Sequence, residues 1–355
     1  MSTTFTLRLP KELLRRMREK RDINWAEVLR DAIRRTLNEP ILPVAVENFI
    51  RSLRDSGEWE LLRCLYLKAD LLNERYAIKN LEIIYPGKAA EILDQLDSLL
   101  KENGFNPDLS GSFEGQPLRD LFKNGLLTYG VYDKFEEDLR RKLEAESWEV
   151  KEAAWLLSQY FIEDPYRDYE YSIWVEPHGF TRALGIILDR EDVLDVINRL
   201  VEIGLVFWDL YSSRAFFHEM IVGADYARSL FIELSTQEGY WFQGISTSLL
   251  KNPDFMAFLK WLSSHGLEFR PVVEYEEEKA KREFKGSRPF DEVLAELVKR
   301  GVVLIDYWPH RRRAGKRSSR PPYWVYRLTP VAKRKLLPRL LTECLSKLNL
   351  RDLQQ

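Results

Sequence analysis

The chain has 355 residues, of which 45% are hydrophobic and 31% are charged, a composition that suits packed domains and excludes an intrinsically disordered chain. No apolar run reaches the roughly 18–20 residues that a membrane helix needs, and the N-terminus lacks the basic-then-apolar order of a signal peptide, so we expect a cytoplasmic protein with no membrane contact. The net charge is −2, but residues 1–40 and 308–340 are basic and the middle of the chain is acidic, which predicts two separate surfaces for nucleic acid.

Residues 1–40 predict one strand followed by two short helices. Apolar residues alternate with Thr4, Thr6 and Arg8, which is the pattern of a strand with one polar face. A basic amphipathic helix follows Pro10. Asn24 then provides an N-cap for a second helix, with a glutamate three residues later as its capping-box partner.

Such a module cannot bury a core alone, because a single strand leaves both of its edges unpaired. Two copies paired antiparallel would form a two-stranded ribbon over four helices, and a ribbon of this kind fits the major groove of double-stranded DNA. Thr4, Thr6 and Arg8 would then contact base edges, with Arg8 suited to guanine. The N-terminus of the second helix, at Asn24 and Trp25, would contact a phosphate. We therefore expect a homodimer formed through the N-terminal ribbon.

The stretch TFTLRLPKELLRRMREKRDINWAEVLRDAIRRTL resembles the ribbon-helix-helix family, and within it the archaeal VapB-type antitoxins. The resemblance lies in the R-L-P strand end, the basic first helix and the I-N-W-A-E-V-L-R second helix. It implies an obligate dimer that binds DNA through the ribbon. It covers about 40 residues, and some 310 residues follow where the antitoxins have a short toxin-binding tail. The scarcity of Gln beside abundant Glu, Arg and Lys indicates a thermophile.

Three later segments resemble one another at a spacing of about 100 residues, which predicts repeated domains. They cover residues 87–105, 189–208 and 288–308, and each is an amphipathic helix that ends at a glycine suited to a left-handed C-cap: Gly104, Gly204 and Gly301. Residues 205–222 and 302–330 follow two of these helices with the pattern strand, turn, strand. A helix followed by such a hairpin is the second half of a winged-helix domain.

The third copy resembles winged-helix transcriptional regulators, through the run YWVYRLTPVAK that begins at residue 323. Its predicted wing holds six basic residues, which we expect to contact a DNA backbone or minor groove: Arg311, Arg312, Arg313, Lys316, Arg317 and Arg320. A solvated loop that only improves solubility is the alternative. The wing of the middle copy has only Arg214 at its tip and is poorly suited to DNA, so we expect this copy to pack against other domains or a partner protein.

No pattern predicts catalysis. Cys64 and Cys344 lie far apart, and none of the four histidines has metal-ligand spacing from another. Phosphate-binding and nucleophile motifs are absent from the sequence. Glu176 and His178 could line a pocket, but a turn capped by the histidine is the simpler interpretation. We expect no enzyme, no catalytic residue, no metal and no cofactor.

These patterns together predict a mainly α fold with small β elements (α+β). We expect four domains: 1–40, ribbon-helix-helix; 45–145, helical, with a degenerate winged helix as the alternative; 146–235, winged-helix-like; and 236–350, a winged helix with the basic wing. The predicted function is sequence-specific, dimeric DNA-binding transcription regulation. The alternatives are an antitoxin-like protein that binds a protein partner through its acidic middle and autoregulates through its ribbon, and a DNA-organising or plasmid-partition protein.

Overall fold

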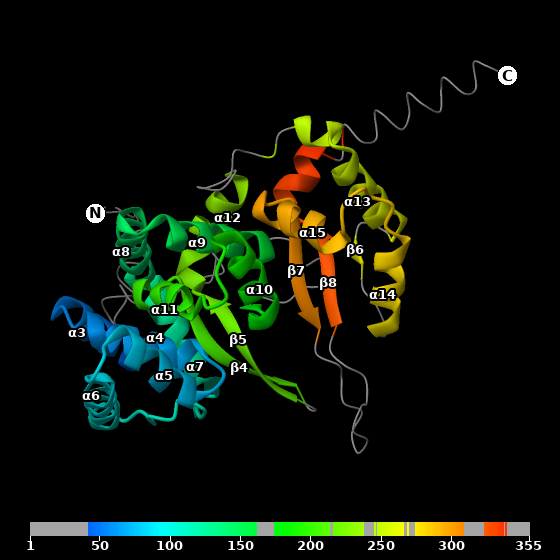
Figure 1. Ribbon diagram of the computed structural model, residues 1–355. Coiled ribbons are helices and arrows are strands. Elements are labelled where there is room, and N and C mark those ends of the chain that lie inside the picture. The colour runs from blue at the N-terminus through cyan, green and yellow to red at the C-terminus, as the bar shows by residue number, and fades with distance from the viewer. Residues whose placement is uncertain are drawn as a thin grey trace, which may run out of the picture.

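The computed structural model describes residues 42–161, 174–213, 216–237, 245, 247–265, 268–269, 274–308, 323–336 and 338. This part of the chain is mostly helical with small antiparallel sheets, so the predicted α+β class is confirmed. Figure 1 shows a group of helices on one side and two hairpins that project in the same direction from the rest of the molecule. Within the described residues no helix is long and apolar enough to cross a membrane.

The first part of the fold, which we call the helical unit, contains six helices and one short hairpin with two residues in each strand. Its elements are α3 (Val44–Asp55), α4 (Trp59–Asp70), α5 (Glu74–Ile84), α6 (Ala89–Glu102), β1 (Ser112–Phe113), β2 (Gln116–Pro117), α7 (Leu118–Thr128) and α8 (Val131–Ala145). The apolar sequence of α4 explains its central place: nine of its twelve residues are buried, and it contacts α3, α5, α6 and α7. The core of this unit therefore surrounds one helix.

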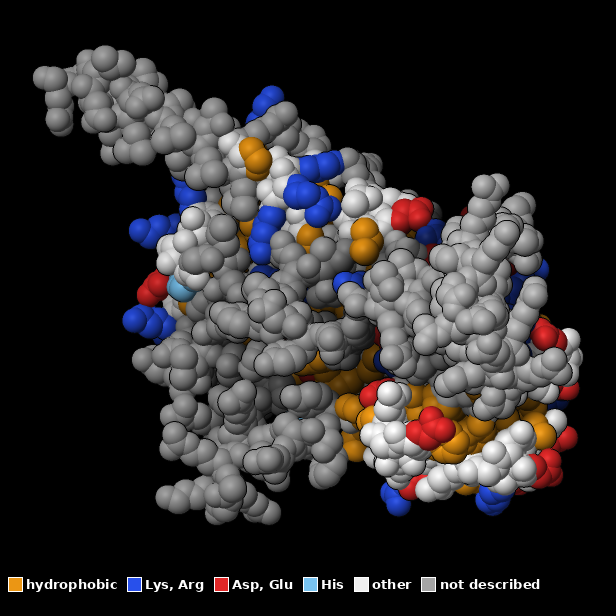
Figure 2. Space-filling view, turned by 180° about the vertical axis from the view of Figure 1, so that it is seen from behind, with side chains coloured by type: hydrophobic (Ala, Val, Ile, Leu, Met, Phe, Trp, Pro, Cys, Tyr) orange, Lys and Arg blue, Asp and Glu red, His pale blue; other side chains and the backbone are white. Residues whose placement is uncertain are grey.

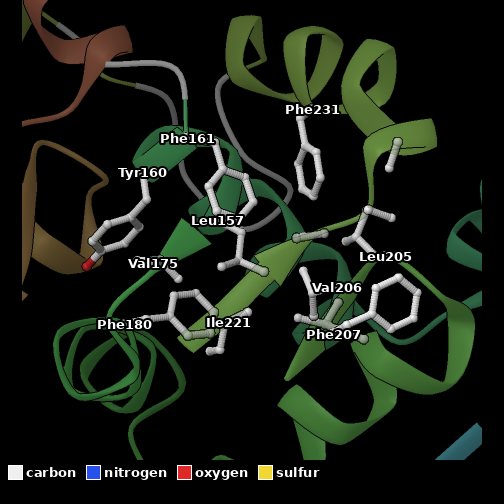
Figure 3. Packing of buried hydrophobic residues seen from close by; sticks show 14 of the residues in the cluster. Leu157, Tyr160, Phe161, Val175, Phe180, Leu205, Val206, Phe207, Ile221 and Phe231 are labelled. Atoms are coloured by element: carbon white, nitrogen blue, oxygen red, sulfur yellow. The ribbon is translucent and has the colours of Figure 1, made fainter. Parts of the chain in front are cut away.

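The next part, the first sheet unit, has a sheet with strand order β3-β5-β4. Its elements are α9 (Trp148–Phe161), β3 (Trp174–Val175), α10 (Pro177–Leu188), α11 (Leu194–Ile203), β4 (Val206–Ser213), β5 (Phe216–Gly223), η1 (Asp225–Ala227) and α12 (Arg228–Thr236). Figure 3 shows how its core forms: side chains from α9, α10 and α12 meet those of the strands, including Leu157, Phe180, Ile221 and Phe231. These apolar residues recur at helical or strand spacing, which places them on one face of each element.

The last part, the second sheet unit, repeats this element order with strand order β6-β8-β7. Its elements are η2 (Thr247–Lys251), α13 (Pro253–Ser264), β6 (Glu268–Phe269), α14 (Glu274–Glu283), α15 (Phe290–Lys299), β7 (Val303–Trp308) and β8 (Tyr323–Leu328), followed by a helix at 330–336. Each sheet unit thus has a helix, a short strand, two helices and a hairpin in the same sequence. The short first strand pairs with the last strand in both.

The three predicted glycine caps are confirmed. Gly104, Gly204 and Gly301 all have positive φ, at 80°, 87° and 65°, just after α6, α11 and α15. A residue with a Cβ rarely adopts this conformation, whereas glycine adopts it freely. At Gly204 space is limiting as well, because an added Cβ would lie 2.8 Å from the Tyr226 hydroxyl oxygen. The glycines therefore turn the chain from each helix towards the following strands.

The helical unit covers the free edge of the first sheet. The Asn80 side-chain amide of α5 donates to the Trp208 carbonyl (2.7 Å) and accepts from the Trp208 amide (2.8 Å), as a neighbouring strand would. The Asp209 carboxylate accepts from the backbone amides of Leu72 (2.8 Å) and Asn73 (3.3 Å). The Asn80 contacts satisfy backbone groups of β4, and the Asp209 contacts satisfy backbone amides just before α5. Together they protect an edge that could otherwise pair with another chain.

A partly buried ionic network also joins these two units. The Lys123 ammonium of α7 lies 2.5 Å from Asp70 of α4 and 2.7 Å from Asp225 of η1. The Tyr66 hydroxyl donates to Asp70 (3.0 Å) and accepts from the Asp225 backbone amide (3.1 Å). Burial, and then the nearby charge of Asp70, raise the pKa of the Asp225 carboxyl to about 6. The helical unit is therefore attached by charge as well as by apolar packing.

Candidate nucleic-acid interface

The predicted DNA contacts lie outside the described residues. Those of the N-terminal ribbon are Thr4, Thr6, Arg8, Asn24 and Trp25, and those of the basic wing are Arg311, Arg312, Arg313, Lys316, Arg317 and Arg320. The structure instead describes the elements to which both segments are attached. These elements decide where the two basic segments leave the body of the protein.

The basic wing is the connection of a regular hairpin. β7 and β8 pair in an antiparallel register that runs from Val303 opposite Leu328 to Trp308 opposite Tyr323. Residues 309–322 therefore leave the sheet and return to it at adjacent positions. The expected strand, turn, strand pattern over 302–330 is confirmed for its strands, and the β4–β5 hairpin confirms that over 205–222.

The base of this hairpin is held by the first sheet unit. The buried Tyr160 hydroxyl of α9 donates to the Ile305 carbonyl. The backbone of Gly179 in α10 lies against β7 so closely that an added Cβ would be 2.8 Å from the Asp306 Cα. Both contacts reach backbone atoms of β7 and not the ends of flexible side chains. The hairpin therefore has a fixed position relative to α9 and α10.

The start of α10 forms the rest of this joint. The Glu176 carboxylate caps the helix by accepting from the Gly179 amide (3.2 Å), and it lies 2.5 Å from His178 Nδ1. The His178 ring stacks on Tyr307 of β7, with the two centroids 4.9 Å apart. The expected cap at this turn is therefore present, but the capping residue is Glu176, and the expectation that the histidine caps the turn was wrong. A carboxylate before a proline at a helix start was the signal for it.

Burial is the main electrostatic effect at the joint. It raises the pKa of Glu176, and the hydrogen bond and charge of His178 act in the opposite direction. Burial also raises the pKa of the Tyr160 phenol well above its ordinary value, so this hydroxyl keeps its proton and donates it to the Ile305 carbonyl. We find no arrangement of His, Cys, Asp and Glu among the described residues that could hold a metal ion.

The helices that precede the two hairpins carry acidic or paired side chains. α11 packs against α5 and α9, and its Arg199 binds Glu146 at 2.6 Å and also Glu202. On α15, Asp291 and Glu292 are exposed. Phosphates repel such surfaces, so neither helix is suited to DNA. The middle copy was expected to pack against other domains or a partner protein, and among the described residues its α11 contacts α5 of the helical unit.

The N-terminal segment joins the body through α3. Leu42 is buried, α3 begins at Val44 directly after Pro43, and α3 packs against α4 and α7. Gly125 of α7 permits this approach, because an added Cβ would lie 2.2 Å from Ile50 Cδ1. The described chain therefore enters a packed helix directly after Pro43, with no spacer between Leu42 and α3.

A family model of ribbon-helix-helix proteins matches residues 5–54. The match supports a ribbon-helix-helix domain at the N-terminus, and proteins of this kind typically bind DNA as dimers. It extends beyond residue 40 and includes nearly all of α3. No curated protein and no solved structure matches the chain.

Proposed function

We propose that this protein is a dimeric, sequence-specific DNA-binding transcription regulator. The observation that carries the proposal is the ribbon-helix-helix match over residues 5–54. In this proposal Thr4, Thr6 and Arg8 contact base edges, and the helix start at Asn24 and Trp25 contacts a phosphate. The two-fold symmetry of the dimer requires a partly palindromic operator.

We further propose that the two sheet units are winged-helix domains, with boundaries near 146–235 and 236–350. Their shared element order and their strand orders, β3-β5-β4 and β6-β8-β7, support this assignment. The helical unit, near 45–145, has only the two-residue strands β1 and β2 and serves as a cover for the first sheet. Residues 1–40 complete the proposed domain list.

The basic wing provides a second DNA contact in this proposal. Arg311, Arg312, Arg313, Lys316, Arg317 and Arg320 all lie in one hairpin connection, whose base is fixed against α10. Two contacts per subunit, joined through packed helices, raise the effective concentration of the second once the first has formed. Two such contacts could also bridge separate DNA segments, which is the basis of the DNA-organising alternative.

The antitoxin-like alternative is favoured by a different observation. Acidic residues outnumber basic ones, 48 to 31, between residues 41 and 307, and Val44 and Leu127 are more than half exposed, at 51% and 57%. Figure 2 shows hydrophobic side chains gathered on the rear face, on the side of the helical unit and beside acidic ones. An exposed apolar area with charged surroundings suits a protein partner.

A genome-wide map of bound sites tests the proposal. A regulator gives a limited set of sites with partial dyad symmetry near promoters, whereas widespread coating supports the DNA-organising alternative. Arg8→Ala should lose sequence preference at one base position per half-site, at a cost of roughly 1–3 kcal/mol. A footprint that Arg8→Ala leaves unchanged contradicts base contact by the ribbon.

A further inference from the structure

A groove of about 850 Å³ lies between the two hairpins, and the exposed side of α10 forms its floor. Figure 1 shows α10 between the β4–β5 hairpin and the β7–β8 hairpin. Pro177, Gly185 and Ile186 contribute apolar floor, Trp208 lies on one side and Trp324 on the other.

Both tryptophans of the groove already bind cations of this chain. The Arg182 guanidinium lies over the Trp324 ring, 4.4 Å from its centroid, and the Lys79 ammonium lies 4.6 Å from the Trp208 ring centroid. Cation–π contacts of this kind are strongest with tryptophan. The sides of the groove are therefore suited to arginine and lysine side chains.

The charge around the groove has the complementary sign. Among the described residues, Glu176, Asp189, Glu191 and Glu219 line the groove, Asp192 stands on the α10–α11 turn at its end, and Asp195 lies in the first turn of α11, which makes six carboxylates. Four cations stand among them: Lys79, Arg182, Arg190 and Lys299. Three of these cations pair with carboxylates of the set, namely Lys79 with Glu219, Arg190 with Asp195 and Lys299 with Asp189. Glu191 and Asp192 are exposed and form no ion pair within the described part of the chain.

His218 adds little positive charge on the hairpin side. Burial lowers the pKa of His218, and the neighbouring His178 lowers it further. A nucleic-acid backbone in the groove would bring its phosphates against the excess of carboxylates, which costs free energy. A basic peptide would instead place its aliphatic stems on the apolar floor and its charged ends among the carboxylates.

We propose that this groove binds a lysine- and arginine-rich peptide segment of a partner protein. The groove geometry, the two tryptophans and the charge excess carry the proposal, and it does not depend on the DNA-binding function. The segment lies along α10 between the hairpins, with cationic side chains near Glu191 and Asp192.

Fluorescence anisotropy of the full-length protein with labelled peptides tests this. The probes are an Arg/Lys/Gly peptide of about 12 residues and a matched peptide with Glu in place of every Arg and Lys. Glu191→Lys reverses an exposed charge at the groove, and Glu91→Lys on α6 is the matched control, because Glu91 is also exposed and outside any ion pair that the described residues form. We expect Glu191→Lys to weaken binding of the basic peptide about fivefold to tenfold, and Glu91→Lys to leave it within about twofold.

Two results would overturn the proposal. In the first, Glu191→Lys does not change the affinity for the basic peptide, or Glu91→Lys lowers that affinity equally. In the second, Arg182→Gln weakens binding of the acidic peptide while Glu191→Lys has no effect on the basic peptide. The second result would assign the groove to an acidic segment. DNA binding by the same variants, measured separately, keeps this result distinct from the proposed regulatory function.

Discussion

Gly179 of α10 lies directly against Asp306 of β7, and an added Cβ on Gly179 would be 2.8 Å from the Asp306 Cα and 2.8 Å from the Ile305 carbonyl oxygen. The two sheet units meet at this point through backbone on both sides. The joint therefore fixes the position of the β7–β8 hairpin, which the basic wing connects.

Gly179→Ala should separate α10 from β7. Overpacking of a rigid contact typically costs about 1–3 kcal/mol, so we expect a lower midpoint in urea unfolding and a disturbed His178–Tyr307 stack. Gly111→Ala is the control, because its added Cβ would meet only an Asn106 side-chain atom at 3.9 Å. Equal midpoints for both variants would show that the joint tolerates a wider spacing.

Lys123→Met should destabilise the attachment of the helical unit. The substitution leaves Asp70 and Asp225 without their cation, and removing one partner of a buried pair costs about 3–5 kcal/mol. We expect about 2 kcal/mol, because the Lys123 side chain is 30% exposed. Thermal unfolding of Lys134→Met provides the comparison, since Lys134 forms only surface pairs on α8 and should change stability far less than Lys123→Met.

Asp225 should make stability depend on pH in a definite direction. Its pKa is about 6 in the folded protein against an ordinary value of 3.8, so between these values the folded state holds a proton that the unfolded state has released. The unfolding free energy should therefore fall as pH rises from about 4 to 6, by about 2–3 kcal/mol from this group.

The check is the difference between the wild type and Asp225→Asn in urea unfolding across this pH range. The asparagine does not titrate, so the wild type should lose stability relative to the variant as pH rises. A constant difference would mean that Asp225 titrates normally in the fold.

Asn80→Ala should lower the free energy of unfolding, because it leaves the edge of β4 uncovered. The Trp208 amide and carbonyl would lose both side-chain partners inside the protein, at about 1–3 kcal/mol for each buried group left unsatisfied. Hydrogen exchange should show faster exchange of the Trp208 amide relative to Phe207. Unchanged protection of Trp208 would show that its hydrogen bond to Asn80 is dispensable.

Neutralising Arg311, Arg312 and Arg313 together with glutamine should weaken binding to all DNA sequences alike. Each phosphate contact that is lost lowers the slope of log K against log salt by about 0.9. We therefore expect a slope smaller by up to about 2–3, measured by anisotropy over a salt series. A slope equal to that of the wild type would assign the wing to solubility.

Local patterns in the sequence determined much of this protein. The alternating strands, the amphipathic helices and the caps at Gly104, Gly204 and Gly301 depend on near neighbours in the chain, and they predicted both hairpins and the helix before each one. The ribbon-helix-helix resemblance of the N-terminus could also be recognised from the sequence, because the motif that carries it lies within 40 residues.

Only the tertiary structure decided what surrounds these elements. In the sequence Asn80 and Lys123 look like ordinary surface residues, yet one completes a strand edge 128 positions away and the other neutralises two partly buried carboxylates. The groove could not be predicted either, since Trp208 and Trp324 are brought to opposite sides of α10 by the packing of two units. Hydrogen bonds, charges and shape act between residues that are close in space, and a sequence pattern shows only those that are also close along the chain.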